Sequence, residues 1–87
     1  MNVEIRKSFT KDADKMPLPY QRQLAIIISA MENASHPSQI DLCKKLKGHK
    51  TAYRIRMGHY RIGFNYENKA IELVRILHRK EIYRYFP

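Results

Sequence analysis

The stretch from residue 50 to residue 66 alternates apolar with polar side chains on both sides of Gly58-His59. An alternation with a period of two predicts two strands, and the Gly-His pair between them predicts a tight turn. A half-buried antiparallel pair needs one apolar face, so the remaining chain must cover that face to build a core. The apolar positions are Tyr53, Ile55 and Met57 before the turn, and Tyr60, Ile62, Phe64 and Tyr66 after it.

The second face of this predicted hairpin carries three arginines, Arg54, Arg56 and Arg61. Core packing does not require them, and like charges on one face repel each other. A guanidinium offers a fork of donors that matches the oxygens of a phosphate. We therefore expect an open, basic sheet face that binds an anion.

The net charge of +9 lies in the second half of the chain. Residues 1–43 contain five Lys or Arg and five Asp or Glu, whereas residues 44–87 contain twelve and three. A localised basic surface predicts a polyanionic partner: RNA, DNA, an acidic protein or a membrane surface. The alternative is that the charge serves solubility alone, which would not require its concentration in one half and among tyrosines.

Length and cysteine content predict a single small domain over residues 1–87 in a reducing compartment. Cys43 is the only cysteine, so no internal disulfide forms, and no Cys or His cluster has metal-ligand spacing. The N-terminus lacks a signal-peptide pattern, and the longest aliphatic run covers only residues 24–28. We expect a soluble, cytoplasmic protein.

The pattern along the chain predicts the order β-α-α-β-β-β, an α+β fold with a helical hairpin on one face of a small, mostly antiparallel twisted sheet. A first strand falls around residues 3–5, and a short helix follows, capped by Ser8 or Thr10. Prolines at 17 and 19 separate it from a second helix. The pattern of residues 70–78 predicts a strand covered on both faces. The tail, residues 79–87, is predicted to form a closing helical turn. The apolar helix positions are Phe9, Ala13 and Met16, then Tyr20, Leu24, Ile27, Ile28 and Met31; Ile82 and Phe86 lie in the tail.

A basic link, KKLKGHK over residues 44–50, precedes the hairpin. Two interpretations are open. Its lysines, Lys47 and Lys50 among them, can lie along a phosphate backbone, or the link can be a solvated loop.

Residues 46–84 resemble the RelE/ParE superfamily of bacterial type II toxins. Four elements carry the resemblance in the order that the superfamily has them: the Leu-Lys-Gly lead-in at 46–48, Tyr-Arg-Ile-Arg at 53–56, Gly-x-Tyr-Arg at 58–61, and the closing His-Arg-x-x-x-Tyr at 78–83. The first half matches by pattern only. The resemblance implies the β-α-α-β-β-β fold and a cognate antitoxin in a hetero-oligomer. It leaves two branches open: RelE-like members cut mRNA, usually in the ribosomal A site, and ParE-like members inhibit DNA gyrase without cutting RNA.

The RelE-like branch implies an endoribonuclease that needs neither metal nor cofactor, in which the RNA 2′-hydroxyl attacks the adjacent phosphorus. Matched motif by motif, Arg61 and Arg79 would contact the scissile phosphate, and Arg54 and Arg56 the flanking phosphates. Tyr83 would orient or deprotonate the 2′-hydroxyl, or stack on a base. His78 is the most conventional acid or base, but it reaches the site only if the strand has ended there. No carboxylate lies beside Arg54, Arg56 or Arg61, unlike in several members of the branch.

Overall fold

The structure is a computed structural model that describes residues 1–87. Its five strands form one sheet in the order β1-β5-β4-β3-β2, in which β1 pairs with β5 in parallel and all other pairs are antiparallel. The predicted α+β class with a mostly antiparallel sheet is confirmed. The elements are β1 Asn2–Ile5, α1 Lys7–Asp14, α2 Leu18–Asn33, the 3-10 turn η1 Pro37–Gln39, β2 Cys43–Lys45, β3 Ala52–Met57, β4 Tyr60–Glu67, β5 Ala70–His78 and α3 Ile82–Tyr85.

The predicted hairpin is the β3–β4 pair. Ile55 lies opposite Ile62 and Met57 opposite Tyr60, and Gly58 takes a positive φ of 59° in the turn, which glycine adopts without steric cost. The apolar face of the hairpin forms the main core with α2, as the alternation predicts. Ile55, Met57, Ile62 and Phe64 are all buried in it.

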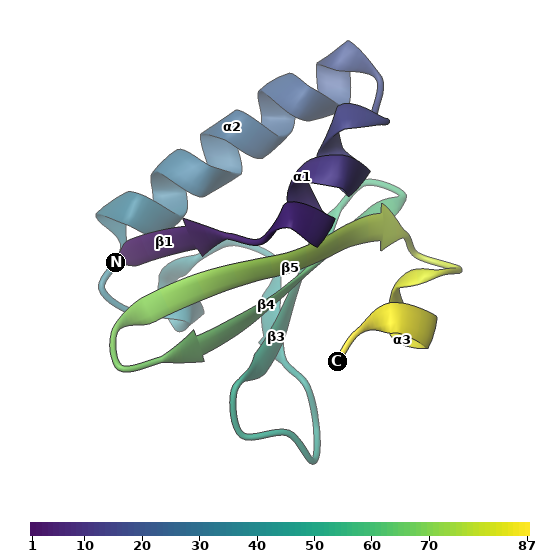
Figure 1. Cartoon of the computed structure of the whole chain (residues 1–87). Helices are drawn as coiled ribbons and strands as arrows, with labels where there is room; N and C mark the ends of the chain where they lie inside the picture. Colours follow the sequence, from purple (N-terminus) through teal and green to yellow (C-terminus); the bar gives the residue numbers. More distant parts are fainter.

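The two N-terminal helices lie on one side of the sheet, and α3 lies beyond the end of β5 on the other (Figure 1). Helix α2 begins after Pro17 and has Pro19 in its first turn, as predicted. Of its predicted stripe, Leu24 and Met31 are buried, and the other members are partly buried against the core. No helix in the structure combines the length and apolar character needed to cross a membrane.

The start of α1 differs from the prediction. The helix begins at Lys7 after Arg6, which makes no side-chain cap, so neither Ser8 nor Thr10 has that role. Helix α1 instead runs along the edge of β5 beyond the last residue of β1. The Ser8 hydroxyl donates to the Val74 carbonyl at 2.6 Å, and Asp12 accepts from the Ile76 amide at 3.1 Å. Polar side chains of α1 thus satisfy backbone groups of β5 that β1 leaves unpaired.

Two features of the second sheet face were not predicted. The first is β2, which pairs with β3 and forms an outer strand of the sheet. The second is a small core on the face that we expected to be open. There Ala52, Ile82 and Phe86 are buried, with Leu46, Val74 and Leu77 packed around them. The C-terminal segment therefore covers the middle of this face and leaves only its turn end to the arginines. It also means that β5 is covered on both faces, as predicted.

Candidate nucleic-acid interface

The three hairpin arginines lie on one face of the sheet, as their spacing predicts. Arg56 is the direct cross-strand partner of Arg61, and Arg54 is opposite Gly63. This is the face of Ala52, away from α2. Because like charges in directly opposite positions destabilise a sheet, this arrangement costs folding free energy.

Backbone carbonyls, not carboxylates, accept hydrogen bonds from two of these guanidiniums. Arg61 Nη1 donates to the carbonyls of Gly58 and Tyr60 at 2.8 and 2.9 Å, and Arg54 Nη1 donates to the Leu42 carbonyl at 3.2 Å. The three ion pairs of the protein involve Arg6, Arg75 and Arg84, so no carboxylate neutralises the hairpin arginines.

Arg61 lies at the centre of the charged group. Partial burial lowers its pKa, the charges of Arg56, Arg54 and Arg79 lower it further, and Tyr83 opposes them. These four residues come from β3, the turn after β5, and α3. The structure therefore brings together five of the predicted residues, Arg54, Arg56, Arg61, Arg79 and Tyr83.

Arg79 and Tyr83 reach this group through the C-terminal segment. The Arg79 amide donates to the His59 carbonyl at 2.8 Å, which ties the end of β5 to the hairpin turn. Arg79 is exposed, and it is Arg84, not Arg79, that approaches the Glu81 carboxylate. Tyr83 follows the fully buried Ile82 and is 56% exposed. A buried anchor next to an exposed phenol fixes the ring at the surface.

Tyr83 lines an open hollow of about 240 Å³ with four cationic residues. Two of them, Lys44 and Lys45, belong to the basic link over residues 44–50, for which the sequence left a phosphate-binding and a loop interpretation open. The signal that could have located them is strand pairing, because β2 places Lys44 directly opposite Arg54. The hollow is lined by Lys44, Lys45, Leu46, Lys47, Arg54 and Tyr83.

Two other predicted residues lie outside this group. Lys50 is exposed in the loop before β3 and does not line the hollow. His78 is still within β5, where it is opposite Tyr60 on the face toward α2. Its Nδ1 accepts from the Lys80 amide at 3.2 Å, and its ring centroid is 6.1 Å from that of His59. The strand has not ended at His78, so Leu77, not His78, shares the face of Arg61.

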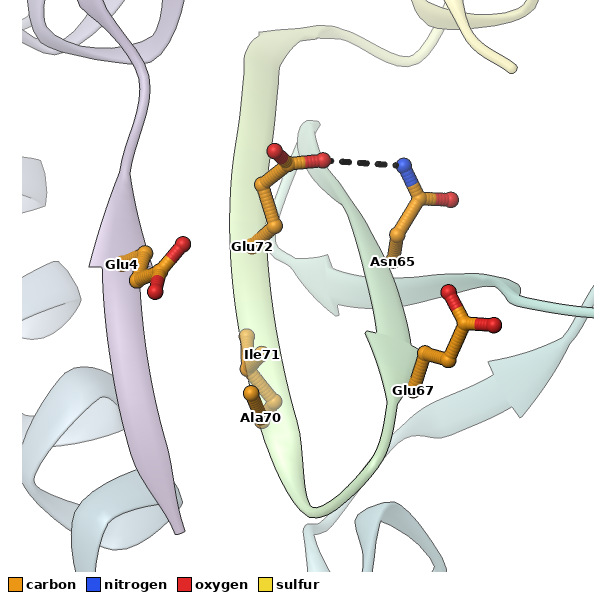
Figure 2. Close-up of a pocket in the computed structure, with 6 residues that line it drawn as sticks. All are labelled: Glu4, Asn65, Glu67, Ala70, Ile71 and Glu72. Atoms are coloured by element: carbon orange, nitrogen blue, oxygen red, sulfur yellow. Dashed lines mark hydrogen bonds between the residues drawn. The ribbon is translucent and has the colours of Figure 1, made fainter.

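The opposite end of the same sheet face is acidic. Figure 2 shows the side chains of Glu4, Glu67 and Glu72. They line a hollow of about 180 Å³, and Asn65 Nδ2 donates to Glu72 Oε1 at 3.3 Å. Glu72 also pairs with Arg6 at 3.0 Å. No three His, Cys, Asp or Glu side chains are arranged to hold a metal ion. The face is therefore polarised, and a polyanion is attracted to the turn end and repelled from the other.

The chain is similar to known toxins of toxin-antitoxin systems. The family described as the ParE toxin of the type II toxin-antitoxin system parDE matches residues 3–83. Toxin RelE3 of Methanocaldococcus jannaschii is 40% identical over 88 residues, which cover all of both chains. A chain of the RelB-RelE antitoxin-toxin complex from Methanococcus jannaschii superposes with a TM-score of 0.80 at 37% identity, covering 97% of this chain and 99% of that one.

The fold also matches the isolated RelE toxin of E. coli, with a TM-score of 0.69 at 17% identity over 95% of this chain and 90% of that one. At that identity the likeness is one of fold alone. The family match and the 40% identical relative both cover most or all of the chain. The protein therefore belongs to the RelE/ParE superfamily of type II toxin-antitoxin toxins.

Proposed function

We propose that this protein is an mRNA endoribonuclease of the RelE type that cuts its substrate in the ribosomal A site. The proposal is carried by one observation, the group of four arginines without a carboxylate partner around Tyr83. A cationic group of this kind matches the charge that develops on a phosphate during transfer. The 40% identity to Toxin RelE3 supports the RelE branch.

In the proposed reaction the 2′-oxygen of the RNA forms a bond to the adjacent phosphorus, and the bond from phosphorus to the 5′-oxygen breaks. The proton of the 2′-hydroxyl leaves as that bond forms, and the departing 5′-oxygen gains a proton. The products are a 2′,3′-cyclic phosphate and a 5′-hydroxyl. Arg61 and Arg79 contact the scissile phosphate and stabilise the charge on the phosphorane, since a planar fork reaches two oxygens at once.

Arg54 and Arg56 hold the flanking phosphates, and Lys44, Lys45 and Lys47 extend this track along β2 and the loop after it. Tyr83 orients the 2′-hydroxyl through its phenol oxygen. Because Tyr83 is exposed and next to the basic hollow, its ring is also accessible to a nucleobase. His78 has no role in this proposal, because it lies on the face toward α2.

A primer-extension assay on mRNA in translating ribosomes tests the proposal. We expect cuts in register with the reading frame for the wild type. For Arg61→Ala we expect the rate of cleavage to fall by a factor of about 10²–10³. Arg22→Ala is the matched control, because Arg22 is an exposed arginine on α2, outside the site. Intact mRNA with the wild type, or equal cleavage by Arg61→Ala, would contradict the proposal. Tyr83→Phe removes the phenol oxygen and keeps the ring, so it tests the two proposed roles of Tyr83 separately.

A second candidate is inhibition of DNA gyrase without RNA cleavage, since the matching family is described as the ParE toxin. A basic face suits an acidic protein surface as well as RNA. This function predicts inhibition of supercoiling while mRNA stays intact, so a supercoiling assay run beside primer extension distinguishes the two. Salt-sensitive RNA binding without either effect would indicate an inactive relative.

We also propose that a cognate antitoxin binds this protein in a hetero-oligomer. Similar chains have been solved in RelB-RelE complexes from Methanococcus jannaschii and Pyrococcus horikoshii. An uncompensated basic face favours an acidic, disordered chain that orders on binding. Addition of the antitoxin should suppress cleavage, and salt should weaken the complex if charge contributes to it.

A further inference from the structure

We infer that Arg75 is a positioning residue that holds the C-terminal segment carrying Arg79 and Tyr83, through an ion pair to Asp12 on one side and the ring of Tyr85 on the other. The inference rests on the proposed function for its catalytic consequence. Its structural part, the docking of α3, stands on contacts between α1, β5 and α3.

The Asp12–Arg75 pair joins the first helix to the last strand. Arg75 Nε donates to Asp12 Oδ2 at 2.7 Å and Arg75 Nη2 donates to Oδ1 at 3.0 Å, while Oδ2 also accepts from the Ile76 amide at 3.1 Å. The side chain of Asp12 is 7% exposed and that of Arg75 is 26% exposed. A two-pronged pair with both oxygens used fixes the plane of the guanidinium.

Tyr85 makes the contact to the C-terminal segment. The Arg75 Cζ atom lies 5.1 Å from the centroid of its ring, within the range of a cation–π interaction. Tyr85 is 52% exposed, so core burial alone does not explain its position. Hydrogen bonding to Asp12 raises the pKa of Arg75, and an arginine is in any case cationic at neutral pH.

Helix α3 needs such contacts because it has only four residues and no side-chain cap. A helix of that length has no stability of its own. Ile82 and Phe86 attach it to the sheet face, and Tyr85 attaches it to Arg75 at the edge of β5. Tyr83 lies between these two attachments. A change at Tyr85 therefore alters the orientation of Tyr83 without touching the hollow that Tyr83 lines.

Arg75 itself does not face that hollow. Arg75 lines a second hollow, of about 330 Å³, between α1, the end of β5 and α3. Lys15, His78 and Glu81 are among the other residues that line it. Asp12 neutralises its charge, in contrast to the four unpaired arginines. Arg75 therefore does not contact the scissile phosphate.

The test compares Tyr85→Leu with Tyr85→Phe in the ribosome cleavage assay and in trypsin digestion. Trypsin can cut after Arg79, Lys80 and Arg84, which flank or lie in α3. Loss of the ring should raise the rate of cutting there about fivefold, the factor that corresponds to one exposed cation–π contact. Tyr85→Leu should lower kcat by a similar factor with KM little changed. Tyr85→Phe keeps the ring and should behave as the wild type.

Arg75→Lys provides a second, independent variant. It keeps a cation that can pair with Asp12 but loses the planar fork, so it should reproduce the trypsin sensitivity and kcat loss of Tyr85→Leu while the protein stays folded. Wild-type trypsin rates for both Tyr85→Leu and Arg75→Lys would overturn the inference, as would a Tyr85→Phe variant as impaired as Tyr85→Leu. If the wild type does not cut mRNA, the proposed function fails, and the trypsin comparison still decides whether Arg75 holds α3.

Discussion

Gly63→Ala is the substitution whose effect follows most directly from the packing of the C-terminal segment. A Cβ at position 63 would lie 2.5, 2.6 and 2.9 Å from three ring atoms of Phe86. Ordinary carbon contacts are about 3.5–4.0 Å, so the ring would have to retreat by about 1 Å. Phe86 is only 2% exposed, and Gly63 lies in a strand that is paired with β3 on one side and β5 on the other. The strain therefore falls on the ring and on α3.

The expected cost is that of overpacking, about 1–3 kcal/mol. For a domain of this size, each kcal/mol lowers Tm by about 4–8 °C. Thermal denaturation should show this loss, and trypsin should cut faster after Arg84 as α3 lifts. On the proposed function, cleavage falls too, because Tyr83 moves with α3.

The matched control is the same substitution in a Phe86→Ala background. Without the ring, Gly63→Ala should be neutral or stabilising by up to about 1 kcal/mol, because alanine restricts the unfolded chain more than glycine does. The destabilisation by Gly63→Ala should therefore be absent or reversed in the Phe86→Ala background, and a double-mutant cycle measures this difference. An equal loss of stability with and without the Phe86 ring would refute the packing argument.

Two further predictions concern the basic face and its neighbour Cys43. Arg56→Gln removes the charge opposite Arg61 and should raise the free energy of unfolding by up to about 1 kcal/mol at low salt. Melts should show this gain shrinking above about 0.1 M salt, and a loss of stability at low salt would contradict it. Burial raises the pKa of the Cys43 thiol to about 11 against the opposing charge of Arg54. Cys43 should therefore react with a thiol reagent about 100-fold more slowly than an unperturbed cysteine at pH 8. Folding stability should fall between pH 9 and 11, where the unfolded chain ionises first, and a reaction rate that levels off near pH 9 would contradict this.

The hairpin and α2 were predictable because their signals are local. Alternation over residues 52–66 fixes both strands and the turn, and the register Ile55–Ile62 follows once the turn is at Gly58. The same alternation places Arg54, Arg56 and Arg61 on one face, so the hairpin part of the site was also accessible from sequence. Proline at 17 and 19 fixes the start of α2 for an equally local reason.

The contacts that complete the site are not local. Strand β2 has only three residues, too few to show the two-residue alternation of a strand. Its lysines are equally compatible with a loop. Asp12 and Arg75 are 63 positions apart, and neither has a neighbour in sequence that indicates the other. The face expected to be open is covered in its middle by Phe86, whose ring packs on Gly63 because that residue has no side chain. The sequence shows the glycine but does not show that an aromatic ring packs against it.

The covered middle also explains how this face tolerates its charge. Arg56 and Arg61 are in direct opposition, and neither has a carboxylate partner. The hydrophobic contacts of Ile82 and Phe86 with the same face offset that repulsion. They also bring Tyr83 and Arg79 to it, so one small apolar cluster both stabilises the charged face and places its C-terminal members. Weakening the cluster should therefore reduce folding stability and activity together, whereas Arg56→Gln should separate them by raising stability while lowering RNA affinity.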